Sequence, residues 1–341
     1  MPWPYRPAPA TDELLSSYLV RCAGRYGMPA SRFCAFHFPG FQVWTRDVDR
    51  SATRPLLDAV AVATGLSHAQ VIRMTLRAEE RRVSVRRARG AAAWINGIGV
   101  YHRVRRLHGL QYCPACLESA VEYKKVWRLS FVVSCETHGC ALRDACPYCD
   151  APIIPHQQMA GAARCHMCHR SLVVAPTPVL EPSRLAVALQ ALCLRALETG
   201  VVDVGGRGVP AQAYFRGLRI LASAVVGSSG GQTGFIAGLP IEHRRTTDRG
   251  AVLISLASLL TDWPDSFHSL VAERHLTQRS FFRVSVPEWV NDEVRHLPRG
   301  RTHNKASRHS LRAKLAALGR RKPAGWRALR AAMLLVAART R

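Results

Sequence analysis

Apolar residues recur at helical spacing through the first eighty positions of the chain, and short turn signals separate the runs. Residues 12–27 (DELLSSYLVRCAGRYG) predict a helix, with Asp12 as its N-cap and Gly27 just past its end. A second helix is predicted over residues 28–38. The pattern therefore indicates a helical N-terminal region.

Two further helices are predicted over residues 55–65 and 66–82, and together they resemble a helix-turn-helix. Gly65 permits a left-handed turn, and Ser67 can cap the second helix. That helix carries three candidate DNA contacts: Gln70, Arg73 and Arg77. Helix pairs of this kind also serve as packing units or partner-binding surfaces, so both interpretations stay open.

The second half of the chain is also predicted to be helical. Residues 184–200 form a strongly amphipathic pattern in which Cys193 lies among leucines and alanines, as a core residue would. Residues 175–183 read as a linker and residues 226–234 as a loop. Further helices are predicted at residues 251–263, 265–274, 307–318 and 325–339.

Charge narrows the choice of partner. The 341 residues include 48 Lys or Arg and 23 Asp or Glu, a net charge of +25 that favours a polyanion such as nucleic acid. From Arg274 to the end there are seventeen basic residues and three acidic ones. The two last helices suit phosphate contacts, which supply affinity but little sequence information. The candidate contacts in this basic region are Arg308, Arg312, Lys314, Arg320, Arg321 and Lys322.

The chain shows no membrane or secretory pattern. Prolines interrupt the first ten residues, and the longest apolar runs are about half a membrane span. We therefore expect a cytoplasmic protein that contacts no membrane. Because that compartment keeps thiols reduced, eleven cysteines favour metal binding over disulfides.

Four pairs of metal-ligand residues follow one another, each with two residues between its members. This spacing lets one tight turn point both side chains at one ion, and zinc suits such thiolate and imidazole sets. Sequential pairing predicts two Zn²⁺ per chain, although a cross-braced pairing has the same ligands. The first set is Cys113, Cys116, Cys135 and His138, and the second is Cys146, Cys149, Cys165 and Cys168.

Three nearby groups are left over. His166 and His169 flank the last pair, and either is an alternative to a cysteine ligand. Cys140 lacks a second cysteine three residues away, so we expect it to pack between the two ribbons as a free thiol. With four protein ligands each, both sites are closed, which indicates a role in folding rather than catalysis.

Catalytic motifs are missing from the sequence. There is no P-loop and no nucleophile elbow. The best carboxylate pair for two-metal chemistry is Asp47 and Asp49, but Arg46 and Arg50 flank it, and this favours a salt-bridged loop. A zinc deaminase would need an H-x-E motif, and His156, His166 and His169 have no glutamate two residues on. The chain is therefore not expected to be an enzyme.

These features define a fold class and a domain division. The fold is predicted to be mainly α, with a helix-turn-helix domain over residues 1–90. Tandem zinc ribbons with short β-hairpins are predicted over residues 91–175, and a basic helical domain over residues 176–341.

Several motifs resemble the TniQ family of transposon target-selection proteins. The proline-rich start and the helix around ELLSSY are similar to that family's opening, and YCPACL, SCETHGCAL, CPYC and CHMC resemble its zinc-ribbon series. DWPDSFHSLV also resembles a family segment. The motifs cover residues 1–180, and the remainder matches more loosely.

The resemblance implies a non-catalytic adaptor. Such a protein marks an insertion site and recruits an AAA+ ATPase regulator, which in turn brings the transposase. It reaches the target either through an RNA-guided CRISPR effector complex, in some systems as a homodimer, or by binding a DNA attachment site. The alternative function is an autonomous zinc-containing helix-turn-helix DNA-binding transcriptional regulator.

Overall fold

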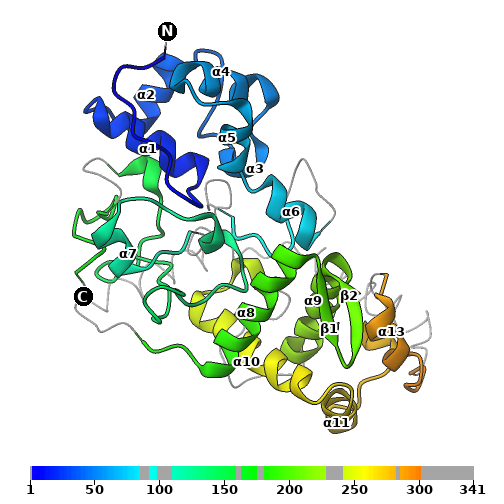
Figure 1. Ribbon diagram of the computed structural model, residues 1–341. Coiled ribbons are helices and arrows are strands. Elements are labelled where there is room, and N and C mark those ends of the chain that lie inside the picture. The colour runs from blue at the N-terminus through cyan, green and yellow to red at the C-terminus, as the bar shows by residue number, and fades with distance from the viewer. Residues whose placement is uncertain are drawn as a thin grey trace, which may run out of the picture. The chain divides into compact units, whose positions relative to one another are not determined.

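The structure is a computed structural model that describes residues 2–84, 92–97, 110–158, 163–174, 180–227, 241–281 and 285–300 (Figure 1). Residues 1–297 form one compact unit, and residues 298–341 are assigned to a second. Helices dominate the described part, and its one sheet has two strands. The prediction of a mainly α fold is confirmed.

The N-cap of helix α1 is Leu14, two residues after the predicted Asp12. Asp12 and Glu13 are drawn into tertiary contacts instead: the Asp12 carboxylate accepts the Val126 amide at 3.2 Å, and Glu13 pairs with Arg21. Gly27 follows the helix with φ +61°, as predicted for its C-terminus. The N-terminal helices are α1 (Leu15–Arg25), α2 (Ala30–His37), α3 (Val48–Ser51), α4 (Arg54–Thr64), α5 (His68–Arg73) and α6 (Arg77–Val83).

The helix predicted over residues 66–82 is wrong in its length. It breaks between α5 and α6, because the Met74 carbonyl accepts the Leu15 amide and the Leu76 amide donates to the Asp49 carbonyl. The turn before it agrees with the sequence: Gly65 is left-handed, and Ser67 forms a capping box with Gln70. DNA reading by this helix pair stays a prediction.

The cysteine region contains turns rather than extended strands. Its antiparallel pairs are single bridges, such as Ser134↔Ala141 and Ala145↔Pro152, so the predicted hairpins are shorter than strands. Helix α7 (Pro114–Ser119) and the 3-10 turns η1 (Lys125–Arg128) and η2 (Pro155–Gln157) complete it.

The described sheet lies further along the chain, where the sequence predicted no strand. Strands β1 (Val201–Val204) and β2 (Arg207–Pro210) pair antiparallel. Gly205 and Gly206 join them, and both have positive φ. A two-residue hairpin turn of this kind requires positive φ, and a Gly-Gly pair between alternating apolar residues is its sequence signal.

The C-terminal helices pack around α10. Helix α8 ends at left-handed Gly200, as predicted, and Cys193 is fully buried within it. Helix α10 packs against α8, α9 and α11. The elements are α8 (Arg184–Thr199), α9 (Ala211–Gly227), η3 (Ile241–His243), α10 (Thr246–Thr261), α11 (Asp265–Glu273), α12 (Gln278–Phe281) and α13 (Glu288–Val294).

In the described part of the chain, every helix is too short or too polar to cross a bilayer. The basic helices predicted over residues 307–318 and 325–339 lie outside the described residues, and so do all six candidate phosphate contacts. Most of the predicted linker and of the loop at 226–234 lies outside them too.

A buried tryptophan ties the predicted segments together within the first unit. Trp94 Nε1 donates to the Phe215 carbonyl at 2.8 Å, and the Trp94 amide donates to Glu242 at 2.6 Å. The Trp94 ring also contacts Phe131 edge-on. Trp94 therefore contacts residues on both sides of the predicted boundary at residue 175. The three-domain division stays a prediction.

Gly217 on α9 is the position where a methyl group has least room. A Cβ there would lie 2.1 Å from the Trp289 ring of α13. We expect Gly217→Ala to lower the free energy of unfolding by about 1–3 kcal/mol through overpacking, measured by urea denaturation. The matched control is Gly24→Ala on α1, where no atom lies within 4 Å. That change should be neutral or stabilising by up to about 1 kcal/mol, and equal losses at both sites would refute the packing argument.

Candidate metal centres

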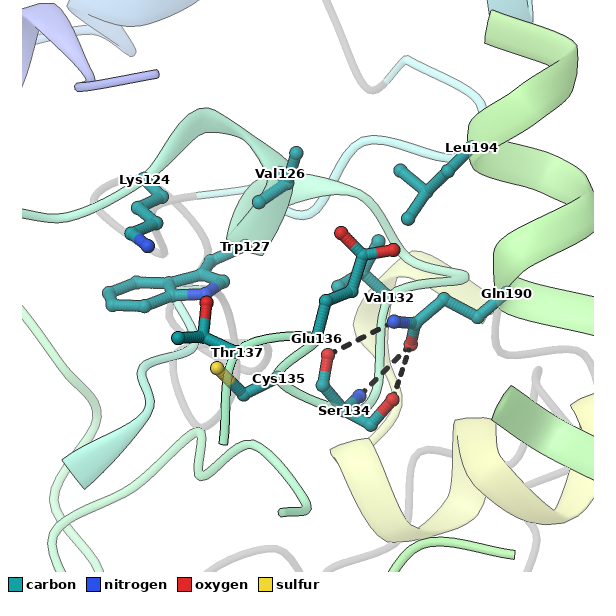
Figure 2. Close-up of a pocket in the computed structure, with 10 residues that line it drawn as sticks. All are labelled: Lys124, Val126, Trp127, Val132, Ser134, Cys135, Glu136, Thr137, Gln190 and Leu194. Atoms are coloured by element: carbon teal, nitrogen blue, oxygen red, sulfur yellow. Dashed lines mark hydrogen bonds between the residues drawn. The ribbon is translucent and has the colours of Figure 1, made fainter. Parts of the chain in front are cut away.

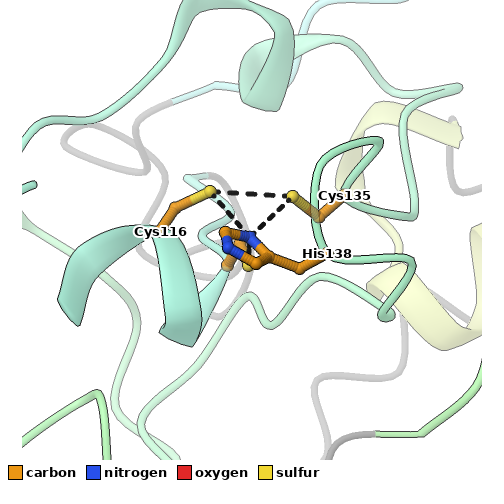
Figure 3. Close-up of side chains that lie close together, drawn as sticks. Cys116, Cys135 and His138 are labelled. Carbon is orange, nitrogen blue, oxygen red and sulfur yellow. Dashed lines mark hydrogen bonds between the residues drawn. The ribbon is translucent and has the colours of Figure 1, made fainter. Parts of the chain in front are cut away.

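The first centre joins helix α7 to the turn that the Ser134↔Ala141 bridge encloses. Cys113 is the N-cap of α7, and Cys116 lies within that helix. Cys135 and His138 come from the turn (Figure 3). His138 Nδ1 lies 3.5, 3.3 and 3.5 Å from the sulfurs of Cys113, Cys116 and Cys135.

These spacings fit a tetrahedral zinc ion. In a tetrahedral site, zinc–sulfur bonds of about 2.3 Å and zinc–nitrogen bonds of about 2.0 Å place two sulfurs about 3.8 Å apart and a nitrogen about 3.5 Å from a sulfur. The Sγ atoms of Cys116 and Cys135 are 3.6 Å apart, and all four ligand atoms lie within 4.8 Å of one another. The donor set can therefore hold a metal ion without rearrangement of the backbone.

The second centre is built from four cysteines on two turns. Cys146 Sγ lies 3.6 Å from Cys168 Sγ, and Cys149 Sγ lies 3.6 Å from Cys165 Sγ. Again all four sulfurs lie within 4.8 Å of one another. The structure thus brings together the two sets that sequential pairing predicts. His166 and His169 are in neither set.

Three of the four ligand pairs share one backbone geometry. The amide of the residue four after the first ligand donates back to that ligand's carbonyl, at 2.9–3.1 Å. The first ligand's own amide donates to the carbonyl five residues on. The donors to the first ligand's carbonyl all have positive φ: Gly139 (+60°), Asp150 (+56°) and His169 (+58°). Each turn is therefore closed by backbone hydrogen bonds that hold both ligands on one side.

The Cys113–Cys116 pair is helical instead. Pro114 occupies the first turn of α7, where a missing amide hydrogen costs nothing, and the Leu117 amide donates to the Cys113 carbonyl at 3.1 Å. The same two-residue spacing therefore produces two backbone forms, and the proline marks the helical one.

The thiols of the first centre lie close together and have different pKa values. A hydrogen bond with Cys113 lowers the pKa of Cys135 to about 4, and the same bond raises the pKa of Cys113. A divalent cation would replace these shared protons and hold all of the thiols as thiolates.

Cys140 lies beside the first centre. Its Sγ is 3.6 Å from Cys113 Sγ, and its carbonyl accepts the Cys135 amide at 2.8 Å. It is outside the group of four ligand atoms that lie together. The turn after His138 returns the chain toward Cys113, and Cys140 is a free thiol, as expected. Its packing between the two ribbons stays a prediction.

Gln190 of α8 forms hydrogen bonds with the segment that leads into Cys135 of the first centre (Figure 2). Its Oε1 accepts the Val133 amide at 2.8 Å and the Ser134 amide at 3.0 Å, and its Nε2 donates to the Ser134 carbonyl at 3.0 Å. Gln190 is buried beside a cavity of about 50 Å³ that Cys135 and Glu136 also line. One helix side chain thus fixes the segment that leads into Cys135, which the sequence did not indicate.

We expect Gln190→Ala to loosen this segment. Two buried amides lose their acceptor, so the free energy of unfolding should fall by about 3 kcal/mol, measured by urea denaturation. The first metal should also leave at lower chelator concentration. A suitable control is Gln212→Ala, an exposed α9 residue that donates to the Arg81 carbonyl and lies outside both centres. The same loss in both variants would mean that Gln190 has no special role.

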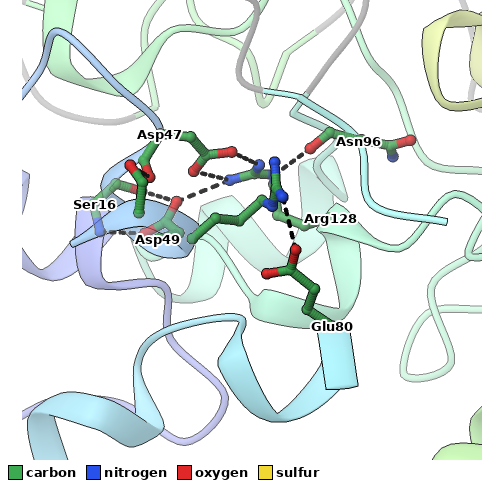
Figure 4. Close-up of polar contacts among 8 residues, drawn as sticks. Ser16, Asp47, Asp49, Glu80, Asn96 and Arg128 are labelled. Carbon is green, nitrogen blue, oxygen red and sulfur yellow. Dashed lines mark hydrogen bonds and ion pairs between the residues drawn. The ribbon is translucent and has the colours of Figure 1, made fainter. Parts of the chain in front are cut away.

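The Asp47 and Asp49 pair is neutralised by a buried arginine (Figure 4). Arg128 is fully buried, its Nη2 contacts Asp47, and its Nη1 lies 2.9 Å from Asp49 Oδ2. The Ser16 amide and hydroxyl also donate to Asp49. The sequence favoured a salt-bridged loop, and a salt-bridged structure is present. Its cation is Arg128, which lies 79 positions from Asp49 along the chain.

Further polar contacts connect this network to neighbouring segments of the chain. Arg50 pairs with Glu80 of α6 at 2.7 Å, and Arg128 Nε donates to the Asn96 carbonyl at 2.8 Å. Burial raises the pKa of Asp49 to about 6, against the opposing effect of Arg128. The network joins α3, α6 and η1, and its carboxylates are occupied by arginine and serine.

Two of the three candidate DNA contacts on the helix pair have structural roles. The side-chain Oε1 of Gln70 accepts the Ser67 amide at 2.8 Å, and Arg77 donates to the Ala52 carbonyl. Arg73 is exposed. Within this set, Arg73 is thus the side chain most available to a phosphate or a base edge.

Comparison with known protein families gives one finding. Residues 4–142 match the TniQ family model. The match takes in the N-terminal helices and all four ligands of the first centre, and it ends before Cys146, the first ligand of the second centre. No curated protein matches the chain.

Proposed function

We propose that the chain is a TniQ-family protein that acts as a non-catalytic adaptor for target selection in DNA transposition, because residues 4–142 match the TniQ family model. It links a target site to an AAA+ transposition regulator, and the regulator in turn brings the transposase. The target is either a DNA attachment site or an RNA-guided CRISPR effector complex. The family match carries this proposal.

The electrostatics of the chain support a nucleic acid at the target. The net charge is +25, and the acidic residues nearest to a catalytic arrangement, Asp47 and Asp49, are bound to Arg128. A polyanion would be drawn to the surface, while chemistry on it would fall to a partner. The adaptor acts in the cytoplasm and has no membrane partner.

We further propose that each metal centre holds one Zn²⁺. Closed sets of three thiolates with one imidazole, and of four thiolates, are typical of structural zinc. Cys113, Cys135 and Cys146 are buried, so the ions would support the fold of a loop-rich segment. With four protein ligands each, the ions would have no open position for water, and they would serve to hold the turns in place.

Retention of the regulator tests the adaptor proposal. Immobilised full-length protein, loaded with target DNA or with the effector complex, should retain the AAA+ regulator encoded by the same element. A matched control is a repressor-type readout: binding to the chain's own promoter with no regulator retained would favour the autonomous transcriptional regulator. Failure to retain the regulator with either target would refute the adaptor.

A further inference from the structure

Four aromatic rings form a continuous row on the N-terminal helices. Tyr5 contacts Tyr26 at 5.9 Å between ring centroids, Tyr26 contacts His37 at 5.9 Å, and His37 contacts Phe36 at 5.0 Å. All three contacts are edge-to-face. The four residues come from the chain start, from the residue after α1 and from the end of α2.

The two ends of the row are exposed to a degree that packing does not explain. Phe36 is 74% exposed and Tyr5 66%, and they are the two aromatics among the exposed large apolar side chains of the described residues. An exposed phenylalanine loses the benefit of burial that its ring would have in the core. Both rings therefore offer faces for a ligand.

Buried aromatic residues pack against this row and hold it in place. Trp3 and Phe33 are buried, and their rings lie 4.8 and 4.4 Å from His37. Trp3 Nε1 donates to His37 Nδ1 at 3.0 Å, which fixes the imidazole plane. The exposed rings therefore stand on a packed base, so little conformational entropy would be lost on stacking.

The charge beside the row selects the ligand. Arg32 is exposed one helical turn before Phe36, on the same face of α2, and exposed Arg25 immediately precedes Tyr26. The two acidic residues of this region are engaged elsewhere, Asp12 with Lys125 and Glu13 with Arg21. Aromatic faces beside unopposed cations suit bases and phosphates, whereas an apolar peptide would gain nothing from the arginines.

We infer that this row is a stacking platform for unpaired nucleotides. Bases stack on Tyr5 and Phe36, and Arg25 and Arg32 contact the flanking phosphates. The inference deepens the proposed function and rests on it for its biological setting, because an adaptor at a guide RNA or at an opened DNA target meets unpaired strands. Stacking tolerates any base, so the platform contributes affinity without reading sequence.

The test compares single strands with duplex. Labelled oligo(dT), oligo(U) and a duplex of the same strand length are titrated with the full chain, by fluorescence anisotropy. The double variant Tyr5→Ala/Phe36→Ala should weaken single-strand binding about 10-fold or more, and duplex binding less than about twofold. Comparison of oligo(dT) with oligo(U) decides between DNA and RNA as the preferred strand.

The controls separate stacking from charge and from folding. Phe36→Trp should preserve binding, and Val62→Ala, which truncates another exposed side chain at 71% exposure, should leave it unchanged. Arg25→Gln/Arg32→Gln should weaken the binding of both single strands and duplex. The slope of the logarithm of the binding constant against the logarithm of salt concentration should become shallower by about one unit per arginine. Unchanged thermal melting of all variants shows that the fold is kept.

Two results would overturn the inference: full single-strand affinity in Tyr5→Ala/Phe36→Ala, or an equal loss on duplex. If that variant instead loses only the AAA+ regulator, the row is a protein interface. Failure of the adaptor proposal has a different signature, because the wild-type chain would then retain no regulator, whatever its affinity for oligonucleotides.

Discussion

Cys135→Ala should remove one metal ion per chain and destabilise the central turns. Cys135 supplies a buried sulfur to the first centre, and its amide closes the turn onto Cys140. Structural zinc contributes about 10–16 kcal/mol of apparent binding free energy in small domains. Loss of one ligand should therefore lower the free energy of unfolding by more than about 3 kcal/mol, a large part of a typical total of about 5–15 kcal/mol.

Metal content and urea denaturation measure this directly, and Cys140→Ser is the matched control. Cys140 also lies in this turn, 3.6 Å from Cys113, but outside the four-ligand set. Its serine variant should keep about two ions per chain and lose less than about 1 kcal/mol. A Cys140→Ser protein with one ion, beside a Cys135→Ala protein with two, would contradict the ligand assignment.

Arg128→Met is expected to have the next largest effect. It leaves the buried Asp49 carboxylate without its cation, and removal of one partner from a buried ion pair costs about 3–5 kcal/mol. The sequence neighbour Arg46 is exposed, so Arg46→Met should change the free energy of unfolding by less than about 0.5 kcal/mol. Equal losses in the two variants would show that Arg128 is not the cation that matters.

The loss in Arg128→Met should depend on pH. Burial already raises the pKa of Asp49 to about 6, above a value near 4 in the unfolded chain, and removal of Arg128 takes away an effect that lowers it. The native variant therefore binds a proton more readily than the unfolded chain. The free energy of unfolding of Arg128→Met therefore falls as pH rises from the unfolded-state pKa of Asp49 through its native-state pKa. Its loss of stability relative to the wild-type chain should become smaller as pH is lowered from 7.5 to about 5.

A triple variant closes this argument. Arg128→Met combined with Asp47→Asn and Asp49→Asn removes every charge of the pair and should recover most of the loss. The recovery is measured as the free energy of unfolding at neutral pH. A triple variant as unstable as Arg128→Met alone would place the loss in packing of the arginine side chain instead of in its charge.

Local signals predicted the local features. The two-residue spacing between cysteines indicated which eight side chains come together, because a closed turn brings both members of a pair to one side. Gly27, Gly65 and Gly200 marked helix ends, since each adopts positive φ. The Gly205–Gly206 turn between β1 and β2 carries an equally local signal, because a Gly-Gly pair between alternating apolar residues is typical of a hairpin.

Distant contacts produced the features that the sequence did not indicate. The break after α5 follows from hydrogen bonds of residues 74 and 76 to Leu15 and Asp49. Arg128 and Gln190 act on residues 79 and 56 positions away, and no spacing rule reaches that far. The aromatic row is also a product of the fold, because it brings Tyr5, Tyr26 and Phe36 together from three segments.

Mapping of insertion sites tests the target-selection role most directly. The transposase and AAA+ regulator of the same element are expressed with and without the chain, and new insertions are sequenced. With the wild-type chain, insertions should cluster at one target, and with Cys135→Ala the cluster should disappear as the adaptor unfolds. The same distribution of insertions with and without the chain would contradict the account.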